Sequence, residues 1–244
     1  MSDTASISLT GDGVAGVLAV APGIGTSAGL QNIKVRADAD YQRIYVSING
    51  GSEFALDATF SSDANGGGYG PTGLNGNYLG VTNFGNVSFL ARAIDEAGGF
   101  GYAGILTPEA NLEVSTATYS GNWTGYINPR SLSDLTSGGG SGTMTLTFDP
   151  TADTMDGTFS GSLNIGSLSG PTVYPVSGVV DANLSGSVFS GTMTANTGVY
   201  QGSAALGGGI YGFDAEDAGG AFAGSINGGS GSQPFYGIIN LDLD

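Results

Sequence analysis

The stretch GGGIYGFDAEDAGGAFAG, residues 207–224, carries the pattern from which the fold of this chain is best inferred. Two segments that alternate apolar and small residues flank a compact acidic stretch, and a period of two is typical of β-strands. We therefore predict a β-hairpin over these residues. Its connection, from Asp214 to Gly220, is expected to close as one helical turn.

The same alternation predicts how the side chains of this hairpin divide between two faces. One face is expected to carry the aromatic side chains, and the other face the aliphatic and small residues. The aromatic set is Tyr211, Phe213 and Phe222, and the small set is Ile210, Gly212, Ala221 and Ala223.

Glycine dominates the composition, with 46 of 244 residues, far above its usual share of about 7%. The sequence has no G-X-Y period, so the glycines favour frequent turns and bent strands rather than a collagen helix. Phenylalanine recurs in DGTFSGSL, GSVFSGTM and GAFAGSI, which indicates one type of strand repeated three times. With 40% hydrophobic residues, the chain can build a packed all-β core.

Acidic residues outnumber basic residues by 21 to 5, which gives a formal net charge of −16. Only acidic charges follow position 130. The basic residues are Lys34, Arg36, Arg43, Arg92 and Arg130. Such a surface repels nucleic acid and anionic membranes, so neither is expected as a partner.

The chain contains no cysteine and no histidine. Disulfides, Cys/His zinc sites and histidine acid–base chemistry are therefore excluded. The sequence also lacks a run of about 18 apolar residues, so no transmembrane helix is predicted. The opening MSDTASISLTGDG has neither a basic segment nor a hydrophobic segment, so we expect no secretory leader within it.

The first half of the chain predicts short strands over residues 31–36, 41–49 and 52–60. The last two are joined by Asn49-Gly50-Gly51, a strong signal for a tight hairpin. Residues 61–76 are rich in Gly, Asn and Asp, which predicts a long surface loop. Three more strands are expected over residues 77–84, 86–94 and 99–106.

From Ala117 onward the pattern is strand, turn, strand, with Asp149 to Asp153 as one of the turns. Nine strand candidates predict an eight-stranded up-and-down barrel in which one strand is short or split. They cover residues 117–127, 143–148, 154–163, 172–180, 184–194, 198–206, 209–213, 221–226 and 235–243.

Three motifs resemble those of the transferrin-binding-protein-B-like β-barrel family of surface lipoproteins. The hairpin matches at Tyr211, Gly212, Asp214, Ala215, Glu216, Gly219, Gly220 and Phe222. The segment before the barrel matches at Thr107, Pro108, Ala117, Thr118, Tyr119 and Gly121, and TLTFDPTADTMDGTFSG resembles a strand, acidic turn and strand of the same family. The resemblance implies an all-β chain with an N-terminal β-sheet handle, residues 1–116, and an eight-stranded antiparallel barrel, residues 117–244.

The resemblance also implies a secreted or cell-surface protein, exposed at the bacterial outer membrane, that captures a partner and is not an enzyme. The partner expected from the family is a protein or an iron- or haem-containing carrier. Two alternatives stay open. One is an acidic structural coat, matrix or adhesion protein, and the other is a carrier that holds a small apolar ligand inside or beside the barrel. Packing of Phe148, Phe159 and Phe189 into the barrel would argue against the carrier.

The residues suggest little catalytic chemistry and no metal site. Lys34 is the only lysine, and its alternating strand predicts a solvated face rather than a partner for a serine nucleophile. Two acidic groups, Asp149, Asp153 and Asp156, then Asp214, Glu216 and Asp217, lie in predicted turns, where Asp stabilises the backbone. Weak Ca²⁺ binding by these groups is the alternative.

If a ligand binds, we predict that Tyr69 and Tyr78 contact it. They lie on either side of the end of the long loop, and tyrosine supplies contact area and a hydrogen bond at a low entropy cost. No cofactor is expected. Haem capture would require Tyr or Met ligation, or ring contacts alone, because histidine is absent.

Overall fold

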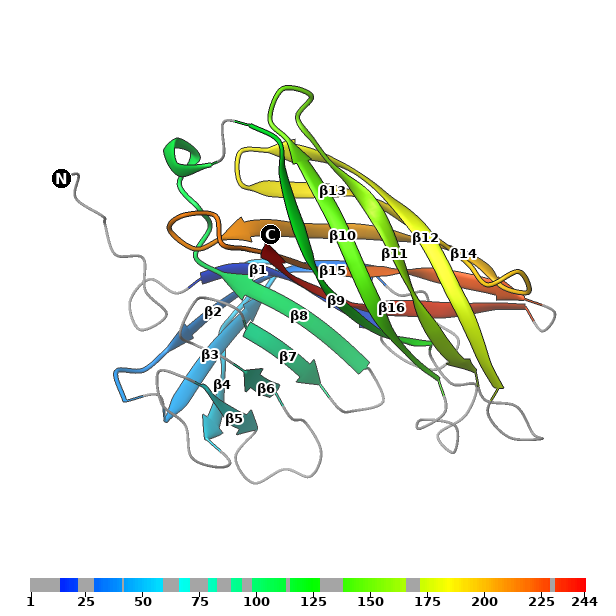
Figure 1. Cartoon of the computed structure of the whole chain (residues 1–244). Coiled ribbons are helices and arrows are strands. Elements are labelled where there is room, and N and C mark those ends of the chain that lie inside the picture. The colour runs from blue at the N-terminus through cyan, green and yellow to red at the C-terminus, as the bar shows by residue number, and fades with distance from the viewer. Residues whose placement is uncertain are drawn as a thin grey trace.

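The computed structural model describes most of the chain as two antiparallel β-sheets (Figure 1). The described residues are 14–21, 29–40, 42–58, 66–70, 79–82, 89–93, 98–112, 115–127, 138–165, 172–228 and 231–244. Among them no helix has the length and apolarity needed to cross a bilayer.

The first sheet, which we call the handle sheet, contains eight strands in the order β6-β5-β4-β3-β2-β1-β8-β7. Their bounds are β1 Val14–Ala21, β2 Gly29–Ala37, β3 Arg43–Ile48, β4 Phe54–Ala58, β5 Gly66–Gly70, β6 Leu79–Thr82, β7 Phe89–Ala93 and β8 Gly98–Gly104. The predicted hairpin between β3 and β4 is confirmed. Asn49 and Gly50 have φ values of 51° and 71°, as a two-residue type I′ turn requires.

One prediction for this sheet is wrong. Residues 61–76 were expected to form a loop, but 66–70 form strand β5, which pairs with β4 and β6. The sequence GGGYG lacks the alternation of apolar and polar residues that identifies a strand, so only the pairing on both sides places it in the sheet.

The second sheet is a closed eight-stranded barrel in which each strand pairs with its neighbours in sequence and β16 closes on β9. A short 3₁₀ helix, η1, Glu109–Asn111, precedes it. The strands are β9 Ala117–Ile127, β10 Gly139–Asp149, β11 Thr154–Ile165, β12 Thr172–Ser185, β13 Val188–Asn196, β14 Gln201–Tyr211, β15 Asp217–Gly228 and β16 Gly231–Leu243. The all-β fold class and the up-and-down barrel are thereby confirmed.

The ninth strand candidate does not exist as a separate strand. Residues 198–206 and 209–213 were predicted as two strands, yet Gln201–Tyr211 is one strand that continues through three glycines. The turn expected near residues 181–183 is also misplaced, because β12 runs to Ser185 and reverses at Gly186, where φ is 59°. Glycine adopts this left-handed conformation without steric cost.

The barrel interior is filled by large side chains centred on Trp123, which is fully buried. Its ring lies 5.7 Å from Phe159, 6.5 Å from Phe222 and 6.3 Å from Phe235 between ring centroids, each with an edge-to-face geometry. The indole N–H donates to the carbonyl of Ser160 at 3.1 Å. Burial of the indole therefore leaves no polar atom unpaired.

The handle sheet lies against the outer wall of the barrel at β15 and β16 (Figure 1). A second apolar cluster joins the two sheets. It contains Val17, Ala19 and the partly buried Leu30 from the handle sheet, and Ala221, Ala223, Tyr236, Ile238 and the partly buried Tyr126 from the barrel. On β15 the residues that face the handle are all small. They are Gly219, Ala221 and Ala223, at alternate positions of the strand. This small-residue row lets the two backbones approach closely.

Tyr102 of β8 anchors the handle sheet on this row. Its hydroxyl donates to Oδ1 of Asn240 at 3.0 Å, and its ring packs 5.1 Å from that of Tyr211. A Cβ atom on Gly219 would lie 2.2 Å from the Tyr102 ring. Because the ring is held on two sides, it has no free direction in which to give way.

We expect Gly219→Ala to lower the free energy of unfolding by about 2 kcal/mol, since overpacking of a closed contact costs roughly 1–3 kcal/mol. The matched control is Gly207→Ala on the neighbouring strand, where a Cβ would meet only Leu30 at 3.5 Å and Val17 at 3.7 Å. The control should be neutral or slightly stabilised. Urea unfolding of the three proteins measures both effects, and equal stabilities would contradict the tight contact.

Candidate functional site

The segment between the two sheets runs antiparallel to the end of β14 and ties both sheets together. Leu106 forms an isolated bridge with Tyr211. The N–H of Thr107 donates to the carbonyl of Ile210 at 3.0 Å, and the N–H of Gly212 donates to that of Ile105 at 3.1 Å. The hydroxyl of Thr107 donates to the carbonyl of Gly212 at 2.8 Å. These bonds fix the handle relative to one end of the barrel.

The acidic turn of the β14–β15 hairpin folds against the same end of the barrel. Its residue Ala215 is fully buried, and its carbonyl accepts a hydrogen bond from the Tyr119 hydroxyl at 2.9 Å. The prediction of a helical turn over 214–220 is wrong. The turn covers only 212–216 and contains Gly212 and Ala215 at φ values of 87° and 58°, which interrupt any helix.

The predicted division of the hairpin faces is also wrong, and the length of the turn explains why. Tyr211 pairs with Asp217, and Leu206 pairs with Phe222. Phe222 therefore points into the barrel core with Leu206, while Tyr211 lies on the outer face toward the handle. Ile210 is in the core, whereas Ala221 and Ala223 face the handle. Phe213 is in the turn and 55% exposed.

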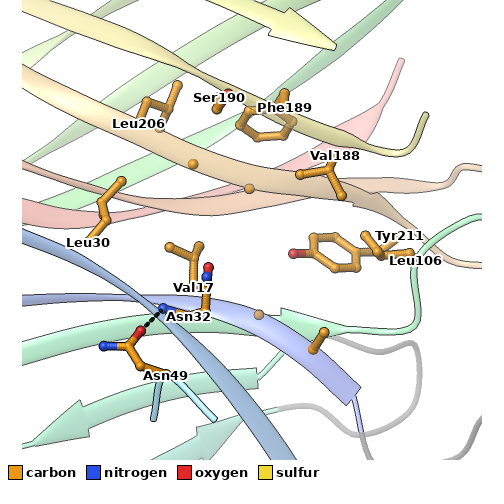
Figure 2. A pocket seen from close by; sticks show the side chains of 14 residues that line it. Val17, Leu30, Asn32, Asn49, Leu106, Val188, Phe189, Ser190, Leu206 and Tyr211 are labelled. Carbon is orange, nitrogen blue, oxygen red and sulfur yellow. Dashed lines mark hydrogen bonds between the residues drawn. The ribbon is translucent and has the colours of Figure 1, made fainter. Parts of the chain in front are cut away.

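A groove of about 370 Å³ lies where β1 and β2 of the handle meet β13 and β14 of the barrel (Figure 2). Its lining is mostly aliphatic or glycine, with the polar groups of two asparagines, a serine and a tyrosine. The lining residues are Ala15, Gly16, Val17, Leu30, Asn32, Asn49, Leu106, Val188, Phe189, Ser190, Leu206, Gly207, Gly208 and Tyr211. None of them carries a formal charge.

A pair of carboxyl groups lies at the base of the same hairpin. Asp217 pairs with Asp242 across β15 and β16. The pKa of Asp217 is raised from 3.8 to about 6, mainly by burial and then by the charge of Asp242, a hydrogen bond with Asp242 and the charge of Glu216. The folded state therefore favours the protonated form of Asp217.

In the other acidic group Asp149 supports the turn, as predicted, but Asp156 lies in strand β11 and not in the turn. Oδ1 of Asp149 accepts hydrogen bonds from the N–H groups of Thr151 at 2.8 Å and Ala152 at 3.1 Å. Oδ1 of Asp156 accepts one from the N–H of Ala182 at 3.3 Å. Within the described ranges, no group of three or more carboxylates is arranged to hold a metal ion.

Of the two tyrosines predicted to contact a ligand, the structure describes only Tyr69. Tyr69 lies in β5, opposite Leu79 in the register, and Tyr78, which precedes Leu79, falls outside the described residues. Their role as contact residues stays a prediction. Lys34 is exposed on β2, as expected for a solvated strand face. Nothing in the sequence pattern pointed to the groove, because its walls come from two separate sheets.

Large side chains occupy the space inside the barrel where the carrier hypothesis would place a ligand. Phe148 and Phe159 are 3% exposed and Phe189 is fully buried, all within the barrel core. Met144, Met155 and Met193 are also buried there, so their sulfur atoms are packed among core side chains. A ligand therefore has no room among these side chains, and the version of the hypothesis that places it inside the barrel is wrong. The version that places it beside the barrel stays a prediction.

Comparison with known proteins identifies the barrel. Residues 113–237, just over half of the chain, match the family described as C-lobe and N-lobe beta barrels of Tf-binding protein B. No curated protein matches the sequence significantly.

Solved structures resemble the whole described architecture. A single-mutant transferrin-binding protein B from Haemophilus parasuis Hp5 aligns with a TM-score of 0.55 and 12% identity, over 93% of this chain and 45% of that protein. The double mutant gives a TM-score of 0.52 and 14% identity, over 93% and 44%. The N-lobe of lactoferrin-binding protein B from Moraxella bovis aligns at 13% identity over 94% and 99%, with a TM-score of 0.39, too low to support an argument. At these identities the likeness shows the fold alone, and the chain spans less than half of the two H. parasuis structures.

We expect Asp217→Asn to stabilise the protein near pH 7 by on the order of 1 kcal/mol, after allowance for solvent screening. Because the pKa of Asp217 is higher in the folded state, the wild-type carboxyl favours folding below about pH 4 and loses that contribution as the pH rises to about 6. The advantage of the variant should therefore shrink toward pH 4. Urea unfolding at pH 4, 5.5 and 7 measures it.

The Asp242→Asn background provides the control for this experiment. There the gain from Asp217→Asn should become smaller but persist, since burial, the largest cause of the shift, remains. If Asp217→Asn stabilised the otherwise wild-type protein equally at all three pH values, the raised pKa of Asp217 would be contradicted.

Proposed function

Because the chain belongs to the family of transferrin-binding protein B β-barrels, we propose that it is a non-enzymatic binding protein, exposed at the bacterial cell surface or released from it. In this proposal it captures a protein partner or an iron- or haem-containing carrier. The family match over residues 113–237 is the observation that carries the proposal. The proteins whose structures resemble it are named for binding transferrin.

The filled barrel supports binding on the outside of the molecule. Its core packs aromatic side chains around Trp123, so the interior serves as a rigid support. Recognition then falls to the outer wall, the turns and the handle sheet, as is usual for sites carried on a stable β-scaffold.

Charge indicates the kind of surface that a partner would present. The sequence carries a net charge of −16, and the strands of the barrel contain no lysine or arginine among their described residues. The described basic side chains lie on the handle, where Arg36 pairs with Glu53 at 2.7 Å and stacks over the ring of Tyr45. A partner that docks on the barrel would thus present a basic face and associate faster at low salt.

Tyr69 and Tyr78 remain our proposed contact residues. Tyr69 lies in the penultimate strand of one end of the handle sheet, and β6 forms the edge beside it. A tyrosine at such a position supplies a large contact area and a hydroxyl to a protein surface.

The proposal is tested by measuring binding of the full chain to immobilised transferrin and lactoferrin, and to haem in solution. We expect saturable binding to one of these, weakened about tenfold or more by the double variant Tyr69→Ala/Tyr78→Ala. For a protein partner, raising the salt from about 0.05 M to about 0.5 M should slow association, because charges are screened.

Phe213→Ala is the matched control, since Phe213 is an exposed aromatic residue at the end of the barrel. It should bind like the wild type. Failure to bind any of the three would overturn the proposed capture of an iron carrier and favour the acidic coat. Binding that the tyrosine double variant leaves intact would move the contact surface away from β5.

A further inference from the structure

The Tyr211 side chain is packed between the two sheets, and its hydroxyl borders the groove. The Tyr211 side chain is only 2% exposed. Its ring packs against Tyr102 on one side and lies over Gly209, whose Cβ position would be 3.1 Å from the ring carbon that bears the hydroxyl. Among the described residues no group forms a hydrogen bond with this hydroxyl. Because the hydroxyl opens onto the groove and is not enclosed by the protein, a molecule in the groove can accept a hydrogen bond from it.

The hydroxyl points into the groove between the handle and the barrel (Figure 2). Val17 and Leu30 stand across from it on the handle, and Val188, which is 44% exposed, forms part of the barrel wall. The glycines of β14 keep the floor of the groove free of side chains. Gly207 faces Leu30 and Val17 at distances that leave room for a single methyl group.

The lining specifies the chemistry of an occupant. Its aliphatic walls favour an apolar molecule. No lining residue is charged, so an ionised ligand would lose its hydration without gaining a counter-charge. Burial raises the pKa of Tyr211 well above its ordinary value, which keeps the hydroxyl protonated and able to donate.

We propose that this groove binds a small, uncharged, mainly apolar molecule whose carbonyl or ether oxygen accepts a hydrogen bond from the Tyr211 hydroxyl. The volume of about 370 Å³ lies at the lower end of the range for small-molecule sites, roughly 300–1,000 Å³. At the opposite end, the Asn49 side-chain oxygen is already engaged by the N–H of Asn32 at 3.0 Å. This site is separate from the proposed capture of a partner and does not depend on it.

The test uses prodan, a neutral naphthalene ketone whose emission shifts to the blue in apolar surroundings and back to the red when its carbonyl accepts a hydrogen bond. Titration of the full chain with prodan should give saturable binding at one site. Tyr211→Phe should weaken it by about threefold to tenfold, the worth of one hydrogen bond, and shift the bound emission further to the blue.

Two further variants separate the groove from other surfaces. Gly207→Ala adds a methyl group that fits without a clash and should weaken binding by filling part of the groove. Phe213→Ala, at the exposed turn, should leave both the affinity and the emission unchanged.

Stability of the free protein provides an independent measurement. Without ligand, Tyr211→Phe should be about as stable as the wild type, because it keeps the packed ring and removes only a hydroxyl that borders the groove. Marked destabilisation would show that the hydroxyl has a structural partner and would overturn the proposal. So would prodan binding that neither Tyr211→Phe nor Gly207→Ala changes, or an absence of prodan binding.

Discussion

The close contact between Tyr102 and Gly219 is the constraint on which the arrangement of the two sheets depends. A tyrosine ring can lie flat against a barrel wall only where that wall lacks a side chain, and β15 offers such a place. The row is continued by Ala221 and Ala223, so the handle strands approach β15 closely along its length. Close packing of this kind gains dispersion energy across the whole contact.

Close packing also determines the interior of the barrel. Large side chains fill the interior around Trp123, while glycines at alternate positions let neighbouring strands bend and approach. The described interior is filled with side chains, which supports the proposal that a partner binds on the outside of the barrel.

Two polar groups near the junction between the sheets are in unusual surroundings. Asp217 is partly buried beside another carboxyl group, and the hydroxyl of Tyr211 has no hydrogen bond within the described part of the chain. Both lie on the hairpin that the sequence marks most strongly, where its first strand meets the segment from the handle. Functional sites often retain such local costs, which the surrounding fold stabilises.

The sequence by itself determined the elements that local patterns encode. Alternation, the Asn49-Gly50 turn and the Asp149 turn identify most strands of both sheets. Their order in the barrel also follows from the sequence, because each strand of an up-and-down barrel pairs with its neighbours in the chain. Only the tertiary structure decided which face each side chain takes. A five-residue turn sets the register so that Tyr211 and Phe222 point to opposite sides, and a change of one residue in that turn would reverse the assignment. Sequence patterns could not predict the groove, because its walls belong to strands more than 150 residues apart that meet only when the handle packs on the barrel.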